Sequence, residues 1–449
     1  MAKDMRIGLA LMFCGLLTVV CDFGLAHGFA QASSNTPTVI ALDKLRLHVV
    51  TLAADKYEGR GAGYKGERQA AEYIAHEFKK ISLKPAGDSN RGRRSYFQEF
   101  KFNPMHPVVP WQVLTSRNIL GLFEGEDPVL RNEIVVVAAH YDGQGRSGQA
   151  DPTRFGIEQA KATNDEIWNS ADDNAASVGA ILEIARALKS GKVVMKRSIL
   201  FIAFGAEEHG MSGSIHYVNH PVFPLSNHVA MINLEKLGRA PEKPFSINGS
   251  RSSPVWQEVV ATAREQTKLN VVPNIPFNVP DSDHYPFNAS RIPAVMIYVS
   301  GTTHAHFASD TADRIDFSRV AHAAQFAMAM VWDLAIRASR PKYAPSPMPD
   351  LGLIGHLATA AEADAKGLSA PGGGLKVTGV IPGLPAGYAG VQPGDFVTDF
   401  AGYQFRRDDK VSALMAVYRE VLEGKRGNVL PLKIIRDKKR LDLTLMMRR

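Results

Sequence analysis

The sequence is nearly free of cysteine. Its 449 residues contain two, Cys14 and Cys21, and both lie in a leading segment that is expected to be removed. The residues before Cys21 lack the small side chains that lipidation requires, so we do not expect a lipoprotein. The mature chain would have no disulfide and no thiolate ligand, and any metal ion must be held by histidine and carboxylate side chains.

A membrane-spanning hydrophobic run is also absent from the leading segment. The apolar stretch Ile7–Val20 is short for a span. Lys3 and Arg6 precede it, and the small-residue site Ala30-Gln31-Ala32 follows it, which is typical of an export signal. We therefore predict a signal peptide at residues 1–32 and a periplasmic or extracellular protein that is not an integral membrane protein.

Concentrated charge is scarce as well. The net charge is +7, but basic residues are scattered along the chain, and the main excess is a terminal group: Arg436, Lys438, Lys439, Arg440, Arg448 and Arg449. No recognised nucleic-acid-binding motif accompanies it, so we interpret the group as a solvated face on a terminal strand and expect no nucleic-acid partner.

Four short apolar runs predict buried parallel strands: 134–139, 198–204, 229–234 and 294–299. Helical spacing is present at 67–81, and strand-like and helix-like segments then alternate from Ile119 to Ala338, with one such helix at 177–188. This alternation is typical of an α/β fold, a doubly wound, mostly parallel sheet with helices on both faces. The polar segments 87–94 and 144–166 are expected to be loops, the second of them rimming a site.

The chain is too long for one compact core, which favours two domains. A proline-rich linker at 341–349 separates a domain at 33–340 from one at 350–449. The second has short strands, tight turns and one helix near 410–422, which predicts a small β-rich domain.

Polar residues follow each of the four predicted strands. The ends of these strands are followed by His140, by Glu207-Glu208, by Glu235 and by His306, with His304 a weaker choice than His306. Ligands bind at the carboxyl ends of strands in open α/β sheets, so these side chains are expected to meet. The remaining histidines considered, His209, His216, His220 and His228, follow no strand end and are expected at the surface.

Two further carboxylate motifs complete the candidate site. Asp142 could orient the His140 ring, and Asp172-Asp173 could either cap the following helix or bridge two cations. Of Glu207 and Glu208, one would bind metal and the other would act as general base. Two histidines and three carboxylates suit a pair of Zn²⁺ ions, although other first-row metals are possible.

From Leu52 to Asp316 the sequence resembles metallopeptidase family 28, the co-catalytic zinc aminopeptidases. The resemblance rests on short motifs: 57–61 (YEGRG), 137–142 (VAAHYD), 171–175 (ADDNA), 206–210 (AEEHG), 232–235 (INLE), 282–284 (SDH) and 306–311 (HFASDT). It implies a zinc exopeptidase fold, with Glu235 in place of the family's common Asp and Lys236 in place of an apolar residue.

The resemblance also implies roles for the site residues. His140 and Glu235 would hold one zinc, Glu208 and His306 the other, and Asp173 would bridge them. Glu207 would be the general base, and Asp142 would orient His140.

Residues 350–449 resemble a bacterial PDZ domain, through 376–383 (KVTGVIPG) and 389–395 (AGVQPGD). The resemblance implies that Leu351–Ile354 would receive the C-terminus of a peptide or protein partner by β-augmentation. A folded spacer that binds nothing would fit the same sequence.

Together these features predict an exported two-zinc exopeptidase, an aminopeptidase acting on peptide substrates. A carboxypeptidase would need a cationic clamp for the substrate carboxylate, and no arginine stands out for it. Two further candidate functions are a glutaminyl cyclase that uses one zinc and a non-catalytic binding protein whose PDZ domain carries the function.

Overall fold

The computed structural model describes residues 39–104, 113–146, 165–191, 194–273, 281–299, 304–344, 351–381, 384–409, 417, 420–421 and 426–447. The predicted signal peptide lies outside these residues. So do most of the loop expected at 144–166, most of the helix expected at 410–422, and positions 345–349 of the linker.

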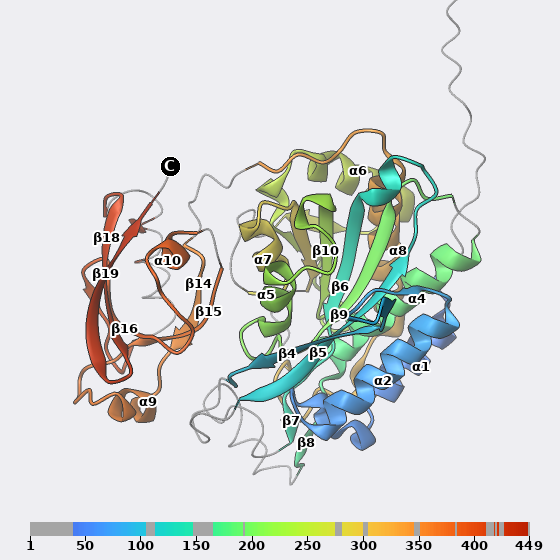
Figure 1. Ribbon diagram of the computed structural model, residues 1–449. Helices are drawn as coiled ribbons and strands as arrows, with labels where there is room; N and C mark the ends of the chain where they lie inside the picture. The colour runs from blue at the N-terminus through green and yellow to red at the C-terminus, as the bar shows by residue number, and fades with distance from the viewer. Residues whose placement is uncertain are drawn as a thin grey trace, which may run out of the picture. The chain divides into compact units, whose positions relative to one another are not determined.

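The larger sheet has nine strands in the order β1-β5-β9-β6-β10-β13-β11-β12, with β4 also paired to β5 (Figure 1). The strands are β1 (Lys84–Pro85), β4 (Phe97–Phe102), β5 (Leu114–Phe123), β6 (Ile134–His140), β9 (Ser198–Phe204), β10 (His228–Glu235), β11 (Phe245–Asn248), β12 (Val271–Pro273) and β13 (Ala294–Tyr298). All four strands predicted from apolar runs are present, as β6, β9, β10 and β13.

Strands β9, β6, β10 and β13 are neighbours and run parallel. The flanking strands do not follow them: β5 is antiparallel to β9, β1 and β4 are antiparallel to β5, and β11 is antiparallel to β13. The sheet is therefore mixed, and the prediction of a mostly parallel sheet was right only for its centre. Strand β4 alternates exposed and buried residues, the pattern of a half-covered antiparallel strand.

The central strands are buried because helices cover both faces of the sheet. In β6, Val135, Val137 and Ala139 enter one core while Ile134, Val136 and Ala138 enter the other. The first face packs against α1 (Leu42–Leu52), α2 (Lys65–Lys80), α4 (Ala176–Ser190), α6 (Val255–Thr267) and α8 (Phe317–Ile336). The second packs against α5 (Ser212–Asn219) and α7 (His284–Ala289). The helices predicted at 67–81 and 177–188 correspond to α2 and α4.

The segment 87–94 is not entirely loop. It contains a short antiparallel hairpin whose strands, β2 (Ser89–Asn90) and β3 (Arg93–Arg94), have two residues each. Both strands are exposed, so no apolar residue signals them in the sequence.

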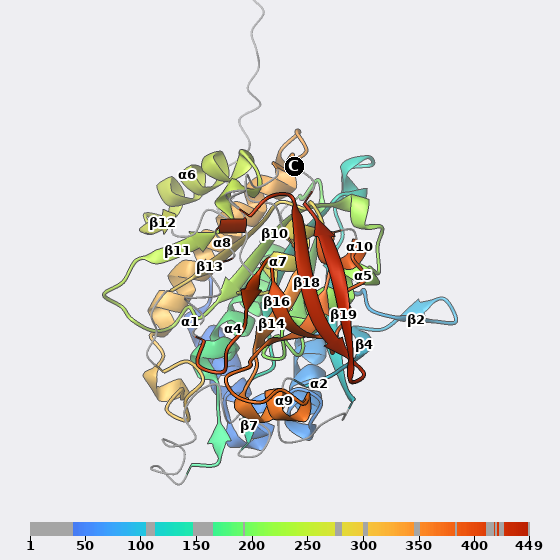
Figure 2. The ribbon, with the colours of Figure 1, turned by 90° about the vertical axis from the view of Figure 1, so that its left-hand side faces the viewer.

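A second sheet has the order β14-β15-β16-β18-β19, with β17 paired to β16. Figure 2 shows β14, β16, β18 and β19 of this sheet. Its strands are β14 (Leu353–Leu357), β15 (Leu375–Val380), β16 (Phe396–Phe400), β17 (Tyr403–Gln404), β18 (Val429–Arg436) and β19 (Lys439–Met446). Two short helices, α9 (Ala360–Ala365) and α10 (Pro385–Tyr388), lie between these strands in the sequence. This sheet encloses a core of its own, so the C-terminal region is β-rich as predicted. Lys438, in the turn between β18 and β19, and Lys439 and Arg440, at the start of β19, are exposed.

Among the described residues, no helix combines the length and the apolar character that crossing a membrane requires.

One buried side chain joins the segments that later meet at the sheet edge. Arg60, the last residue of η1 (Asp55–Arg60), is completely buried. Its guanidinium donates to the carbonyl oxygens of Leu52 (2.7 Å), Tyr141 (2.7 Å), Asn169 (2.8 Å) and Ser170 (2.7 Å). It thereby fixes the end of α1, the residues after β6 and the residues before α4 relative to one another.

We predict that Arg60→Met destabilises the protein by about 3 kcal/mol or more, because each buried carbonyl left without a donor costs roughly 1–3 kcal/mol. The measurement is the free energy of unfolding in denaturant. The control is Arg264→Met on the exposed side of α6, which should change it by about 0.5 kcal/mol at most. Equal effects of the two substitutions would show that the Arg60 hydrogen bonds contribute nothing.

Candidate metal centre

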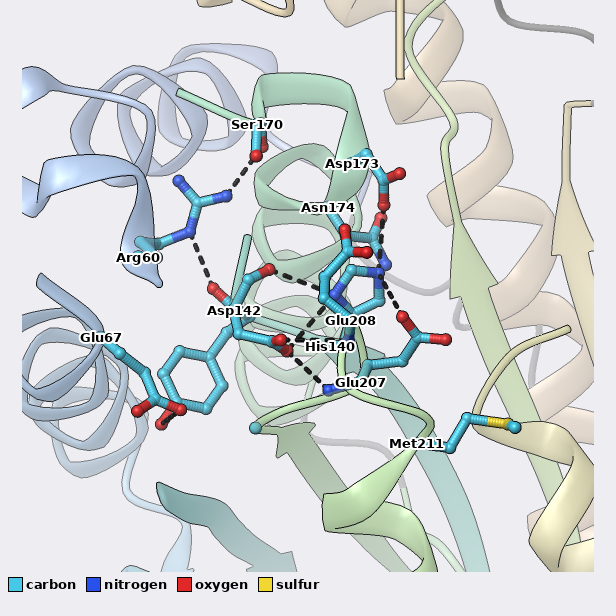
Figure 3. Close-up of polar contacts among 12 residues, drawn as sticks. Arg60, Glu67, His140, Asp142, Ser170, Asp173, Asn174, Glu207, Glu208 and Met211 are labelled. Atoms are coloured by element: carbon cyan, nitrogen blue, oxygen red, sulfur yellow. Dashed lines mark hydrogen bonds and ion pairs between the residues drawn. The ribbon is translucent and has the colours of Figure 1, made fainter. Parts of the chain in front are cut away.

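The side chains predicted from strand ends lie at one edge of the larger sheet. Figure 3 shows His140, Glu207 and Glu208 of this set, together with Asp173. His140 is the last residue of β6 and Glu235 the last of β10. Glu207 and Glu208 follow the end of β9 by a short turn, and His306 follows β13. Asp173 comes from η3 (Ala171–Ala175), the irregular turn that leads into α4. Because the four strands are parallel neighbours, their carboxyl ends bring these groups together.

Asp173 lies between the two imidazoles. Its Oδ1 is 3.2 Å from His140 Nε2, and its Oδ2 is 3.0 Å from His306 Nε2. Asp172 lies beside it but is engaged elsewhere, since its Oδ1 accepts the backbone N–H of Gly238 at 2.6 Å. The sequence left open which of the two aspartates faces the histidines, and the structure places Asp173 there.

Each histidine also faces a glutamate. His140 Nε2 is 3.3 Å from Glu235 Oε1, and His306 Nε2 is 3.1 Å from Glu208 Oε2. Two groups with ligand atoms within 4.8 Å of one another result, His140–Asp173–Glu235 and Asp173–Glu208–His306, and they share Asp173. His304 does not join them, because its Nδ1 hydrogen-bonds to Ser309 Oγ at 2.8 Å.

Glu207 lies beside this pair of groups. Its Oε2 is 3.9 Å from His140 Nε2, farther than the oxygens of Asp173 and Glu235. Together with His140 and Glu208 it forms a third group that satisfies the same distance limit. Glu207 is thus within reach of the centre without having an imidazole as a close partner.

Asp142 connects the end of β6 to the turn after β9. Its Oδ1 accepts the backbone N–H of Glu207 at 3.0 Å, and its Oδ2 accepts that of Glu208 at 3.2 Å. His140 Nδ1 is 3.2 Å from the Asp142 carbonyl oxygen and 3.6 Å from its Oδ1. A proton on Nδ1 would leave Nε2 as the ligand atom, with the backbone carbonyl as the nearer acceptor rather than the expected carboxylate.

Glu235 is held by three donors. Ser282 Oγ and Asn174 Nδ2 donate to its Oε2 at 2.9 and 3.2 Å, and Lys236 Nζ donates to its Oε1 at 2.8 Å. The side chain of Lys236 retains 24% exposure and also lies 3.8 Å from Asp173 Oδ2.

Asp310 and Arg239 hold the backbone of the turn that carries Asp173. The sequence analysis assigned neither residue a role. Asp310 accepts the backbone N–H groups of Asp172 and Asp173 at 3.0 Å, and Arg239 Nη2 donates to Asp310 Oδ1 at 3.1 Å. The signal available in the sequence was the spacing of Asp310 four residues after His306. Arg60, within the 57–61 motif, was missed in the same way.

The electrostatics of the edge favour positive charge. Burial disfavours the imidazolium of His140, but Glu235 and Glu207 outweigh burial and raise its pKa well above the usual value. Burial likewise opposes protonation of His306, but Glu208 and Asp173 raise its pKa to about 10. An electrostatic field that holds protons on these two imidazoles would also hold metal cations in their place.

The two adjacent glutamates have opposite shifts. Burial raises the pKa of Glu207 well above its usual value, and the nearby Glu235 and Asp283 add to the shift against the opposing charge of His140. Burial would raise the pKa of Glu208 too, but His306 lowers it to about 2. One carboxylate is thus poised to take up a proton while its neighbour stays ionised.

The four histidines expected at the surface divide into two pairs. His209 and His228 are buried, which corrects the expectation, and His228 Nε2 lies 2.7 Å from the hydroxyl of Tyr217. His228 is the first residue of β10, so its backbone position places it in the core. His216 and His220 stack on each other at 4.6 Å between ring centroids, and His220 is exposed.

The donor set fits a pair of divalent metal ions. It contains imidazole nitrogens and carboxylate oxygens only, which zinc accepts. Both oxygens of Asp173 are buried and face different histidines, as a carboxylate shared by two ions requires.

The segment that carries these residues matches a peptidase family and two curated relatives. The model of peptidase family M28 matches residues 118–331. Aminopeptidase YwaD of Bacillus subtilis is 30% identical over 239 residues, which are 51% of this chain and 47% of that protein. The alkaline phosphatase isozyme conversion protein of Escherichia coli is 25% identical over 210 residues, 46% of this chain and 53% of that protein. The chain spans about half the length of the curated relatives it matches.

Solved structures share the fold. A zinc aminopeptidase from Bacillus subtilis superposes with a TM-score of 0.50 at 20% identity, covering 68% of this chain and 98% of that one. A Zn-dependent exopeptidase from Parabacteroides distasonis gives 0.52 at 20% identity, covering 66% and 99%. A glutaminyl cyclase from Bacteroides thetaiotaomicron gives 0.51 at 19% identity, covering 66% and 98%.

These likenesses confirm the α/β fold of the zinc exopeptidase type. They do not extend to the PDZ resemblance, which stays a prediction. Every predicted metal ligand, together with Glu207 and Asp142, falls within the segment, residues 118–331, that matches peptidase family M28.

Proposed function

We propose that the protein is a zinc-dependent metallopeptidase, an aminopeptidase that removes N-terminal residues from peptides. The observation that carries this proposal is the Asp173 carboxylate, which lies between His140 and His306 while each histidine faces its own glutamate. The match of residues 118–331 to peptidase family M28 supports it.

In this proposal His140 and Glu235 would hold one zinc ion, Glu208 and His306 the other, and Asp173 both. Bound zinc supplies a Lewis acid for the scissile carbonyl and lowers the pKa of the attacking water. Asp142 positions the centre, because its carboxylate fixes the backbone of Glu207 and Glu208 while its carbonyl faces His140 Nδ1.

Glu207 would act as the general base and then the general acid. Its carboxylate accepts a proton from the attacking water and returns the proton to the leaving amine, so the group ends each cycle unprotonated. The raised pKa of Glu207 suits a group that must hold a proton for part of the cycle. Glu208, whose pKa is lowered to about 2, is suited to remain a ligand.

A glutaminyl cyclase is the second candidate, because one such enzyme shares the fold at a TM-score of 0.51. It would perform intramolecular acyl transfer with one zinc. Two groups of candidate ligands, His140–Asp173–Glu235 and Asp173–Glu208–His306, have Asp173 in common, and this arrangement favours the two-ion peptidase.

The proposed function is tested by assaying the purified protein on free aminoacyl substrates, on N-blocked peptides and on peptides with N-terminal glutamine. Cleavage of the free aminoacyl substrates alone is expected. Chelation should abolish the activity and Zn²⁺ should restore it. Cleavage from the C-terminus, or formation of a cyclised product instead of hydrolysis, would replace the aminopeptidase assignment.

We predict that Glu207→Gln keeps the metal content of the wild type but lowers kcat by about two to four orders of magnitude, the usual contribution of general base catalysis. Glu208→Gln, which weakens a ligand, should lose metal as well as activity. Metal content measured by elemental analysis separates the two. Near-normal turnover in Glu207→Gln would remove this residue from the base role.

We also propose that residues 350–449 form a PDZ domain, following a peptidase domain at 33–340 and a linker at 341–349. Supporting it, β14 is at the end of the strand order in the described second sheet, where a peptide strand can be added. The ligand would be the C-terminus of a peptide or protein.

A chain ending at Ala344 tests this domain separation. It keeps the hydrogen bond from Ala344 N to Ser252 O, and every proposed metal ligand. We expect unchanged kcat/KM on a small aminoacyl substrate and a lower value on long peptides. Loss of activity on the small substrate, in a truncated chain that remains folded and zinc-loaded, would mean that the C-terminal region contributes to the active site.

We propose finally that the protein is exported, on the basis of the charged start, the apolar stretch and Ala30-Gln31-Ala32. N-terminal sequencing of the protein from its native host should find a mature chain that begins near Ser33. A cytoplasmic protein that retains Met1 would contradict export.

A further inference from the structure

Lys236 brings a fixed positive charge into the candidate metal centre. It directly follows Glu235 and has a positive φ of 48°. Its Nζ lies 2.8 Å from Glu235 Oε1 and 3.8 Å from Asp173 Oδ2. The same Oε1 is the oxygen that faces His140 Nε2.

The two proposed metal positions therefore differ in charge. At the position formed by His140 and Glu235, both oxygens of Glu235 already accept hydrogen bonds, Oε2 from Ser282 and Asn174 and Oε1 from Lys236. At the other position the glutamate oxygen nearest the histidine, Glu208 Oε2, faces His306 at 3.1 Å. The Lys236 ammonium is 2.8 Å from the Glu235 oxygen that faces His140 and 3.8 Å from the Asp173 oxygen that faces His306, so its charge acts more strongly on the Glu235 side of the centre.

A cation that binds Glu235 Oε1 must displace an ammonium or tolerate it at short range, and two positive charges at such a distance repel strongly in a buried site. We propose that Lys236 makes the two metal positions unequal, so that the Glu208–His306 position fills first and tightly, and the His140–Glu235 position fills second and weakly. This inference rests on the proposed metal centre and deepens it.

The test measures metal binding and does not depend on catalysis. Metal-free protein is titrated with Zn²⁺ in competition with a chromophoric chelator. The wild type should bind two ions, with dissociation constants that differ by about tenfold or more, given the repulsion expected at this range. Lys236→Met, which removes the charge and keeps an unbranched chain, should tighten the weaker ion by about tenfold or more and the other ion by less, because the ammonium is nearer to Glu235 Oε1 than to Asp173 Oδ2.

Two matched variants control this experiment. Lys236→Arg keeps the charge and should keep the two constants unequal. Lys433→Met removes a charge from an exposed position on β18 and should leave both constants unchanged. Identical constants in the wild type and Lys236→Met would overturn the inference, as would tightening in Lys433→Met equal to that in Lys236→Met.

A second measurement needs no variant. With one equivalent of Mn²⁺ added to the metal-free wild type, electron paramagnetic resonance should show isolated ions, because the tight position fills alone. A spin-coupled pair from the first addition would overturn the inference. If the protein cleaves aminoacyl substrates but binds two ions with equal affinity, the proposed function stands and only this inference fails. If it binds two ions unequally but has no peptidase activity, the inference stands and the proposed function fails.

Discussion

Repulsion among buried carboxylates is the constraint on which this edge of the sheet depends. Four carboxylates meet at this edge: Asp173, Glu207, Glu208 and Glu235. Asp142 adds a fifth, which accepts the backbone N–H groups of Glu207 and Glu208. Buried like charges are costly unless cations or hydrogen-bond donors compensate them. Three kinds of group provide such compensation here: two imidazoles with raised pKa, the Lys236 ammonium, and backbone N–H groups that donate to carboxylates. The guanidinium of Arg60 also compensates the carboxylates. Burial lowers its pKa to about 10, and the negative charges of Asp310 and Asp142 oppose that shift.

The fold explains why the carboxylates meet here. Strands β9, β6, β10 and β13 are covered by helices on both faces, so their interiors are almost entirely apolar. The buried Asn233 of β10 is an exception, and its amide donates to Ser282 Oγ. The carboxylates and imidazoles of the centre lie at the strand ends or beyond them, and parallel strands end at the same edge. The turns after these strands then carry the polar residues, and Arg60 holds the neighbouring turns in place through their carbonyl oxygens.

The same logic separates what the sequence could predict from what it could not. His140 and Glu235 were found because each ends an apolar run, a local signal that one sequence contains. Arg60 and Asp310 were not assigned roles, because their partners are backbone groups of remote segments, and a sequence does not show which side chain such a group contacts. The choice between Asp172 and Asp173 depends on the path of one irregular turn. His228 was wrongly expected at the surface, because the first residue of a strand can be as buried as its centre. The antiparallel flanking strands were not predicted, because strand direction is set by pairing rather than by composition.

The centre is also assembled from parts that are distant along the chain. His140, Asp173, Glu208, Glu235 and His306 come from five separate segments, each followed or preceded by a helix or strand that must be in place first. Contacts of such long sequence separation form late in folding, because loop closure costs entropy before any contact is gained. A chain that has not completed its sheet thus has no chelating site to offer. A ligand that recognises only the finished edge would bind the native state and not the unfolded one, and so would stabilise the whole sheet through mass action.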